Sequence, residues 1–501
     1  MKILRGAGQS YFALLYLALL PLPSIAADPP NIEGTWKIAA AQVSFKPEGA
    51  SIPFTDQGRK RYQENKRKQA KRAYDDYDYM TSRCASPGLP RLMLTPDRFR
   101  IWQRPGLTMF LFEWNRLFRQ IDVGGLPKRL IVTAGPGEED NDALIGRAAP
   151  IANGHWEGDT LLVETKGFNE DSLIDNLVPH GDKMKLSERI RLKNADTLED
   201  RITIEDPDYF TRPWQTVVVY QRQPDAPFPE NVCIDRLPAA VQAQSAPARS
   251  GEPGGQTAVA PASAGPPPIP PLPPLPVGAP EPAADPHSFD GVWTSLGSPI
   301  QFQIVTDMFG NKVPFNAAGL KVMYRRVKSL EDGTPFINAS SHCLPMGQPW
   351  QMDTPGSFHV FQSKDTFDIQ FQEYHGFLEI VMDPAKAPPP GYMGRSVGHW
   401  DGDTLVVESS GFKEAIWVDS VGTPASRNAK LTQRIRKVKS DNWYLEVQYT
   451  LDDPTYYTRP WSWVRAYTWR PDMTLFSEYN CELQTAAPYE LYPSLIPEPQ
   501  E

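Results

Sequence analysis

Short stretches of β-branched and aromatic residues, each bounded by Gly, Pro or Asp, recur along the whole chain. Such stretches are typical of β-strands, whose side chains alternate between the two faces of a sheet. In the first half they lie at 109–112, 161–163, 201–204 and 217–220, and in the second half at 369–372, 405–407, 445–449 and 464–467. Many short antiparallel strands are the pattern of a sandwich or a closed barrel.

One segment in each half departs from the strand pattern. Residues 58–76 are rich in Lys, Arg, Gln and Ala, and residues 317–330 occupy the corresponding place in the second half. These residue types favour helix. The sequence therefore predicts an all-β protein with one short helix in each half, the first helix exposing its basic side chains to solvent.

The two halves are copies of each other. Residues 154–168 read GHWEGDTLLVETKGF and residues 398–412 read GHWDGDTLVVESSGF. A match of this length indicates a tandem duplication, with repeats at 27–237 and 288–497. Residues 238–287 are dominated by Ala and Pro, a composition that predicts a disordered, semi-rigid linker.

The N-terminus has the features of a secretory signal peptide. Lys2 and Arg5 precede an apolar run at 11–20 that is too short to span a bilayer, and small residues end at Ala26. We expect residues 1–26 to be removed near Ala26 and the mature protein to be periplasmic or secreted. No later segment is long and apolar enough to cross a membrane, and the net charge of −9 disfavours nucleic acid as a partner.

Export gives the four cysteines an interpretation, because each repeat carries two of them. In an oxidising compartment we expect the disulfides Cys84–Cys233 and Cys343–Cys481. Each closes a long loop, which stabilises a fold by about 3–5 kcal/mol in the chain-entropy model. No Cys-x-x-Cys motif or His pair accompanies them, so a zinc site is the weaker interpretation, and we expect no metal or cofactor.

Each repeat opens with Gly-x-Trp, at 34–36 and at 291–293. This motif resembles the first strand of lipocalins and other calycins, in which the Trp fills the closed end of the barrel. The resemblance implies two tandem antiparallel β-barrels, that is, lipocalin-like domains.

A second signature is DPDYFTRPW at 206–214 and DPTYYTRPW at 453–461. Together with the GHW segments and the pattern around Cys84 and Cys233, it resembles a large group of uncharacterised exported bacterial proteins. That resemblance implies export and a β-rich fold and supplies no activity. Arg212 and Arg459 of this signature either brace a corner of the barrel or lie at the mouth of a ligand cavity.

The repeated GHW segment allows two interpretations. On a continuous strand His155 and Asp159 share one face and form a candidate acid–base or metal site. Gly158 instead indicates a tight hairpin turn, which takes these side chains out of register. In the second repeat His375 and Glu373 are two residues apart and form another candidate acid–base pair.

The repeats also differ within one predicted strand. When Glu113 is aligned with Glu373, one face of this strand is apolar in both repeats. The opposite face then carries Phe in the first repeat and Gln in the second. The candidate ligand contacts are Phe110 and Phe112 in the first repeat and Gln370, Gln372 and Trp463 in the second.

Three hypotheses of function follow. The first is an exported protein that binds a small molecule, or a polymer, with one cavity in each repeat. The second is an extracytoplasmic hydrolase, isomerase or cyclase that uses a His–carboxylate pair in one barrel. The third is a structural or interaction protein of the cell envelope. The oligomeric state is not indicated.

Overall fold

A computed structural model describes residues 29–49, 51–83, 86–124, 151–168, 170–232, 272, 274–295, 304–331, 344–354, 356–372, 376–413 and 416–473. The predicted signal peptide, the four cysteines, and the pair Glu373 and His375 lie outside these residues. The two disulfides and that acid–base pair therefore stay predictions.

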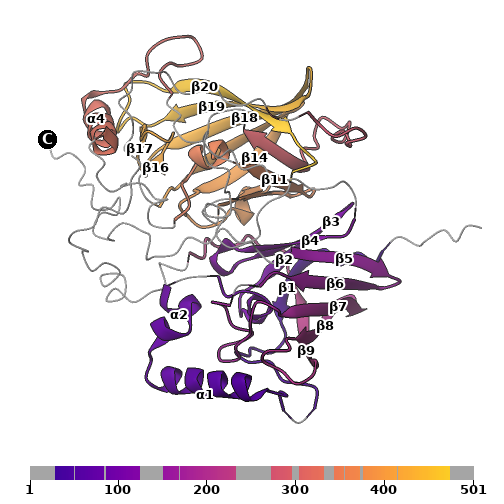
Figure 1. Cartoon of the computed structure of the whole chain (residues 1–501). Helices are drawn as coiled ribbons and strands as arrows, with labels where there is room; N and C mark the ends of the chain where they lie inside the picture. Colours follow the sequence, from indigo (N-terminus) through magenta and orange to yellow (C-terminus); the bar gives the residue numbers. More distant parts are fainter. Residues whose placement is uncertain are drawn as a thin grey trace, which may run out of the picture.

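Each repeat forms its own closed barrel of nine strands. In the part of the chain that the structure describes, every strand ladder pairs strands of the same repeat. Figure 1 shows the first barrel, in indigo to magenta, below the second, in orange to yellow. The predicted all-β architecture of two tandem barrels is confirmed.

The first repeat contains helices as well as the nine barrel strands, with α1 running along the far end of its barrel (Figure 1). The elements are β1 Gly34–Ile38, α1 Asp56–Ala70, α2 Tyr79–Arg83, β2 Phe99–Arg104, β3 Leu107–Phe112, β4 Phe118–Asp122, β5 Ile151–Glu157, β6 Thr160–Lys166, β7 Lys185–Asn194, β8 Thr197–Glu205 and β9 Trp214–Gln223, with short 3₁₀ turns at Tyr74–Asp76, Arg91–Leu94 and Trp114–Arg116.

The second repeat follows the same order and adds one small two-stranded sheet, β16–β17. The elements are β10 Gly291–Ser295, α4 Ala317–Glu331, β11 Ser357–Gln362, β12 Thr366–Phe371, β13 Phe377–Val381, β14 Arg395–Asp401, β15 Thr404–Ser410, β16 Ile416–Trp417, β17 Pro424–Ala425, β18 Lys430–Lys439, β19 Trp443–Asp452 and β20 Trp461–Trp469, with 3₁₀ turns at Trp350–Asp353 and Pro384–Lys386.

The strands are antiparallel to their neighbours except at one place in each barrel. The pair β4–β5 and its counterpart β13–β14 are parallel. A ring of nine strands cannot close with alternating directions throughout, because the number of reversals around a closed ring must be even. One parallel pair removes this conflict.

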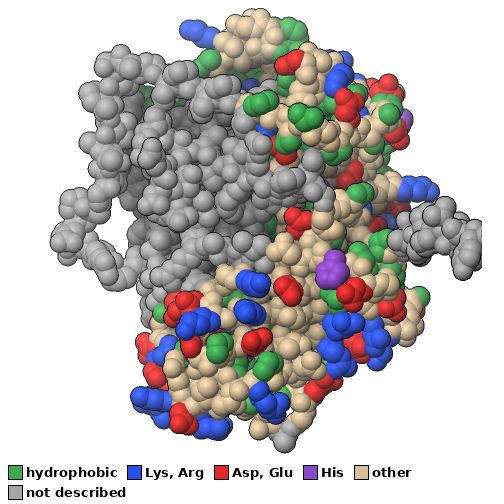
Figure 2. Space-filling model, turned by 45° about the vertical axis from the view of Figure 1, so that its right-hand side comes forward, with side chains coloured by type: hydrophobic (Ala, Val, Ile, Leu, Met, Phe, Trp, Pro, Cys, Tyr) green, Lys and Arg blue, Asp and Glu red, His purple; other side chains and the backbone are tan. Residues whose placement is uncertain are grey.

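Helix α1 begins at a capped N-terminus and ends before the predicted segment does. The hydroxyl of Thr55 accepts a hydrogen bond from the Gly58 amide, as an N-cap does. Glu64 forms ion pairs with Lys68 at 3.0 Å and Arg61 at 3.5 Å, so this basic helix carries its own counterions. Figure 2 likewise shows Lys and Arg interspersed with Asp and Glu over the first repeat.

The Gly-x-Trp motifs lie at equivalent ends of the two barrels. Trp36 and Trp293 are completely buried, and each indole N–H donates to the carbonyl oxygen four residues earlier. Arg222 lies over Trp36 at 4.2 Å from the ring centroid, whereas Trp469 contacts Trp293 edge-on at 5.0 Å. Both motif glycines have φ near +128°, a backbone conformation that disfavours residues with a side chain.

The strand ladders correct the alignment of the repeats. Phe99 pairs with Phe112 in the first barrel, and Phe358 pairs with Phe371 in the second. Phe112 therefore corresponds to Phe371 and not to Gln372. Matching Glu113 with Glu373 was wrong by one residue, and a shift of one residue exchanges the two faces of a strand. The predicted contrast of Phe with Gln on one face is therefore wrong.

The two barrels pack against each other through corresponding faces. The outward side chains of β2–β4 meet those of β11–β13 in an apolar cluster that includes Met109, Leu111, Phe118 and Phe377. Trp102 stacks on Phe361 with centroids 5.9 Å apart. Because each repeat uses the equivalent three strands, the interface resembles that of a symmetric dimer within one chain.

A buried ionic group lies within this interface. The guanidinium of Arg100 donates to the carboxylates of Asp368 and Glu379, and Trp102 donates its indole N–H to Asp368 at 3.0 Å. Arg100, Asp368 and Glu379 are each at least nine-tenths buried. The barrels are thus joined by apolar and charged contacts together.

Segments between the barrels also cross the interface. Residues 224–232 extend from the first barrel, where Phe228 joins the interface cluster and Glu230 accepts from the Met393 amide at 2.8 Å. Residues 274–287, at the end of the predicted linker, lie against the second barrel. There, the Trp469 indole donates to the Pro280 carbonyl at 2.8 Å.

Candidate functional site

The GHW segments form the β5–β6 and β14–β15 hairpins. Glu157 pairs with Thr160 across a two-residue turn, in which Gly158 has φ of +60°. The predicted tight turn is confirmed. His155 is 67% exposed and lies 3.4 Å from Glu157, whereas Asp159 accepts a hydrogen bond from Thr160. The structure therefore places His155 and Asp159 at an exposed hairpin and does not join them as a pair.

The DPxY motifs form corners that hold the segment before β7 or β18. The carboxylate of Asp206 accepts the Gly181 amide at 2.7 Å, and Asp453 accepts the Ser426 amide at 2.7 Å. Both aspartates are buried. Arg212 is exposed, and Arg459 is half-exposed and forms an ion pair with Asp307 at 3.2 Å.

The candidate ligand contacts divide between the inside and the outside of the barrels. Phe110 and Phe112 point into the first barrel, where Phe110 stacks on Phe99 and Phe112 contacts it in a tilted arrangement. Gln370 is on the outward face of β12, and Gln372, just after the end of the strand, is in the same alternation. Both side chains are buried. The side-chain amide of Gln370 donates to the Phe371 carbonyl at 2.9 Å.

Sequence reasoning missed a cluster of ionisable side chains inside the first barrel. Arg119 on β4 donates to Glu188 on β7, with 2.8 Å between Nη1 and Oε1. Both residues are at most 2% exposed. Tyr220 on β9 donates its hydroxyl hydrogen to the Met93 carbonyl at 3.1 Å. These side chains come from strands that are not neighbours in the sheet, so they meet across the interior only when the barrel closes.

Asp200 completes this cluster and has an unusual environment. It is 1% exposed, and no N–H or hydroxyl group of the described residues donates to its carboxyl oxygens. Burial raises the pKa of Asp200 well above its usual range, and the nearby negative charge of Glu188 adds to the rise. The protonated acid is therefore favoured, its O–H donates to Glu188, and its other oxygen remains as an acceptor in the barrel interior.

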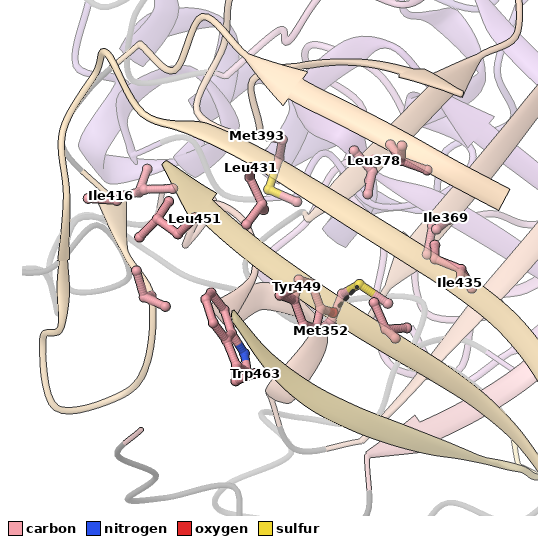
Figure 3. Close-up of a cluster of buried hydrophobic side chains, with 14 of the residues drawn as sticks. Met352, Ile369, Leu378, Met393, Ile416, Leu431, Ile435, Tyr449, Leu451 and Trp463 are labelled. Carbon is pink, nitrogen blue, oxygen red and sulfur yellow. Dashed lines mark hydrogen bonds between the residues drawn. The ribbon is translucent and has the colours of Figure 1, made fainter. Parts of the chain in front are cut away.

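The second barrel has a different polar cluster. The hydroxyls of Tyr449 and Tyr467 lie 2.9 Å apart, and the Tyr467 hydroxyl donates to Asp353 at 3.1 Å. Arg465 also donates to Asp353, at 3.2 Å. Trp463 stacks on Tyr449 with centroids 5.3 Å apart. Figure 3 shows Trp463 and Tyr449 side by side among the apolar side chains of this core.

The corrected alignment shows that the two clusters occupy the same part of the fold with different chemistry. Glu188 and Gln433 lie opposite corresponding valines, Val163 and Val407. Strand pairing also identifies the residues of the second barrel that correspond to Arg119 and Asp200. They are apolar: Leu378 corresponds to Arg119, and Val447 corresponds to Asp200.

One sequence signal could have found the first cluster. The strand 186–190 reads LSERI, so Glu188 is in phase with Leu186 and Ile190, the residues that point into the core. A charged residue in the buried phase of a strand must have a partner or a function, because an isolated buried charge is too costly. The partner, Arg119, is separated by 69 residues and could not be identified from this pattern.

Two cavities lined by described residues lie outside the barrel interiors. One, of about 380 Å³, lies between the barrels and includes Arg100 and Glu379 in its wall. The other, of about 390 Å³, lies beside α1 and includes Ser172 and His180. Within the described ranges, no group of three or more His, Cys, Asp or Glu side chains is arranged to hold a metal ion.

None of the helices in the described part of the chain is sufficiently long and apolar to span a bilayer. No protein-family model matches this chain, and none of the curated proteins compared with it is similar enough to count as a relative.

Proposed function

We propose that each barrel binds a small molecule in its interior. The observation that supports this most directly is a set of buried polar atoms without hydrogen-bond partners among the described residues: Arg119 Nε and Thr108 Oγ1 in the first barrel, and Trp461 Nε1, Trp463 Nε1 and Gln433 Oε1 in the second. An unsatisfied buried polar group costs about 1–3 kcal/mol. A ligand that satisfies several of them at once recovers this energy.

The charges of the first barrel indicate the chemistry of its ligand. Glu188 neutralises Arg119, and the raised pKa of Asp200 favours its uncharged form. The cluster as a whole is then neutral, and its remaining capacity is for hydrogen bonds. A small, uncharged, polar molecule with both donors and acceptors fits it best.

The aromatic side chains of the second barrel indicate a different ligand. Trp463 lies between Tyr449 and Trp461, with 4.6 Å between the two indole centroids. Such side chains favour stacking on a flat ring. The indole N–H groups are donors only, so we infer an aromatic or sugar ring that carries acceptors.

The purified full chain provides the test. Small molecules released by denaturation are identified by mass spectrometry for the wild type and for two variants that copy the other repeat. Asp200→Val introduces the valine that the second repeat carries at 447. Trp463→Thr introduces the threonine that the first repeat carries at 216, because Thr216 and Trp463 occupy the same position in the two barrels. The exposed His155→Ala variant is the control.

We expect the wild type and the control to release one compound for each barrel, and each variant to lose only the compound of its own barrel. The proposal is wrong if the wild type releases nothing and a panel of small sugars, amides and phenols leaves its melting temperature unchanged. Ordered water would then satisfy the buried groups.

We further infer that the protein acts outside the cytoplasm, as its N-terminal segment and its resemblance to exported bacterial proteins indicate. Cell fractionation followed by N-terminal sequencing tests this proposal. A mature chain beginning near Ala27, with masses that reveal two disulfides, is expected. A cytoplasmic chain that keeps residues 1–26 would contradict it.

A further inference from the structure

The loop before β7 brings a serine and a histidine into contact at the edge of a cavity. The Oγ atom of Ser172 lies 2.9 Å from Nε2 of His180. The other ring nitrogen, Nδ1, lies 3.0 Å from the carbonyl oxygen of Gly181. Ser172 is half-buried and His180 is 2% exposed, and both line the cavity of about 390 Å³ beside α1.

The hydrogen bonds determine which nitrogen of His180 carries the proton. A carbonyl oxygen only accepts, so Nδ1 must donate to Gly181. In the neutral ring Nε2 then has a free electron pair and accepts the hydroxyl hydrogen of Ser172. Burial lowers the pKa of His180, which keeps the ring neutral at neutral pH. A neutral imidazole hydrogen-bonded to a serine hydroxyl is the arrangement that activates a serine nucleophile.

The second repeat shows that the fold does not require this polar pair. In each repeat a buried aspartate, Asp175 or Asp419, accepts amide hydrogens from the turn that follows it. Measured from this shared turn, Ile416 replaces Ser172 and Ala425 replaces His180. Ile416 and Ala425 form an apolar cross-strand pair in β16–β17. Only the first repeat has a nucleophile and a base at this position.

The cavity wall indicates the kind of substrate. Lys60 and Arg61 of α1 line it together with acidic side chains, and Tyr77 and Tyr209 supply aromatic surface. The lining is mostly polar and has more acidic than basic side chains, so it favours a small polar molecule that carries no negative charge. The volume of about 390 Å³ limits the molecule to a modest size.

We propose that Ser172 and His180 form a catalytic nucleophile and general base that hydrolyse small, polar carboxylic esters. Oγ of Ser172 attacks the ester carbonyl carbon, and the hydroxyl proton passes to Nε2 of His180. The C–O bond to the alcohol breaks, and this proton leaves with the alcohol. Water then attacks the carbonyl carbon of the acyl–serine ester and gives a proton to Nε2. That proton returns to Oγ as the carboxylic acid leaves, so ester and water give acid and alcohol.

Two measurements on the purified full chain test the proposal. A fluorophosphonate probe forms a covalent bond with activated serines, and peptide mass spectrometry locates the modified residue. Hydrolysis of p-nitrophenyl acetate, a small neutral ester, gives the rate. We expect the probe at Ser172, and a rate that falls at least about 100-fold in Ser172→Ala, the order expected for removal of an acid–base or nucleophilic group.

The double variant Ser172→Ile/His180→Ala separates catalysis from folding. It copies the pair that the second repeat carries in the same place, so we expect it to fold with an unchanged circular dichroism spectrum and to lose activity. Ser187→Ala, at an exposed position on β7, is the matched control and should keep the wild-type rate. Probe attached elsewhere, or a wild-type rate equal to that of the double variant, would overturn the proposal.

Discussion

Arg100 offers the sharpest test of whether the two barrels form one unit. Its guanidinium is 3.1 Å from Glu379, also bonds Asp368, and lies 4.7 Å from the centroid of Phe228. All of these partners except Phe228 belong to the second barrel. The substitution Arg100→Ala removes the guanidinium and leaves the carboxylates in place.

The expected cost follows from what remains buried. Asp368 is completely buried and, among the described residues, keeps the N–H of Trp102 as its remaining donor, and Glu379 keeps the amide of Phe228 at 3.0 Å. Removing one partner of a buried ion pair destabilises a protein by about 3–5 kcal/mol, because the other charge stays buried without compensation. We expect a loss in this range at pH 7, located at the contact between the barrels.

A double-mutant cycle measures this contact directly. Urea unfolding, followed by tryptophan fluorescence, is compared for the wild type, Arg100→Ala, Asp368→Asn and the double variant. A coupling energy above about 1.5 kcal/mol is expected for a close, desolvated pair. The same cycle on the exposed pair Arg436 and Glu446 should give less than about 1 kcal/mol. Equal coupling for the two pairs would refute the reasoning.

The same site makes stability depend on pH. Burial, with the negative charge of Asp368 as the second cause, raises the pKa of Glu379 to about 7, against about 4.3 for an unperturbed glutamate. Between these values the folded protein keeps a proton that the unfolded chain has lost. The contribution of Glu379 is therefore fully present below about pH 4.3 and is lost as the pH rises through 7, by up to about 1.4 kcal/mol per pH unit.

Glu379→Gln should flatten this decline, as urea unfolding between pH 5 and pH 8 would show. An unchanged slope in that variant would mean that Glu379 does not hold the proton.

Two further predictions concern single residues in the barrels. Gly291→Ala should destabilise the second barrel by more than about 2 kcal/mol, because φ is +128° and a Cβ atom would lie 2.3 Å from the Trp469 ring. Gly402→Ala is the control: its Cβ atom would meet open space, so it should destabilise the barrel by only about 1 kcal/mol, for its positive φ. Equal melting temperatures for the two variants would contradict this prediction. Asp200→Val should stabilise the ligand-free protein by about 1–3 kcal/mol at pH 7, because it removes a buried carboxyl group that lies beside the negative charge of Glu188 and introduces the residue of the second repeat at 447. The raised pKa makes this gain larger at pH 7 than at pH 4, and a variant that is destabilised at both pH values would contradict the prediction.

Several features were accessible from the sequence because they depend on neighbours along the chain. The self-match of residues 154–168 with 398–412 predicted the duplication, and short apolar stretches predicted the strands. Gly158 predicted the hairpin turn, because a two-residue turn needs a backbone conformation that glycine adopts without strain. The Gly-x-Trp resemblance led to the barrel, and Trp36 and Trp293 lie at equivalent ends of the two barrels.

The candidate site was much less accessible. An alignment through Glu113 was wrong by one residue, and this error exchanged the inner and outer faces of β3 and β12. Sequence patterns in a strand have a period of two, so every such error reverses the prediction of what a side chain contacts. The pairing registers of the closed barrels were needed to correct it.

The sequence alone thus determined that this protein is a duplicated β-rich chain with short strands and a proline-rich connection, since local composition and periodicity carry that information. Only the tertiary structure decided that β2–β4 pack on β11–β13, that Arg119 meets Glu188, and that Ser172 meets His180. Contacts between residues far apart in the chain, or across a loop of irregular backbone, have no periodic signal in the sequence. They are created when the strands close into barrels and the barrels pack together.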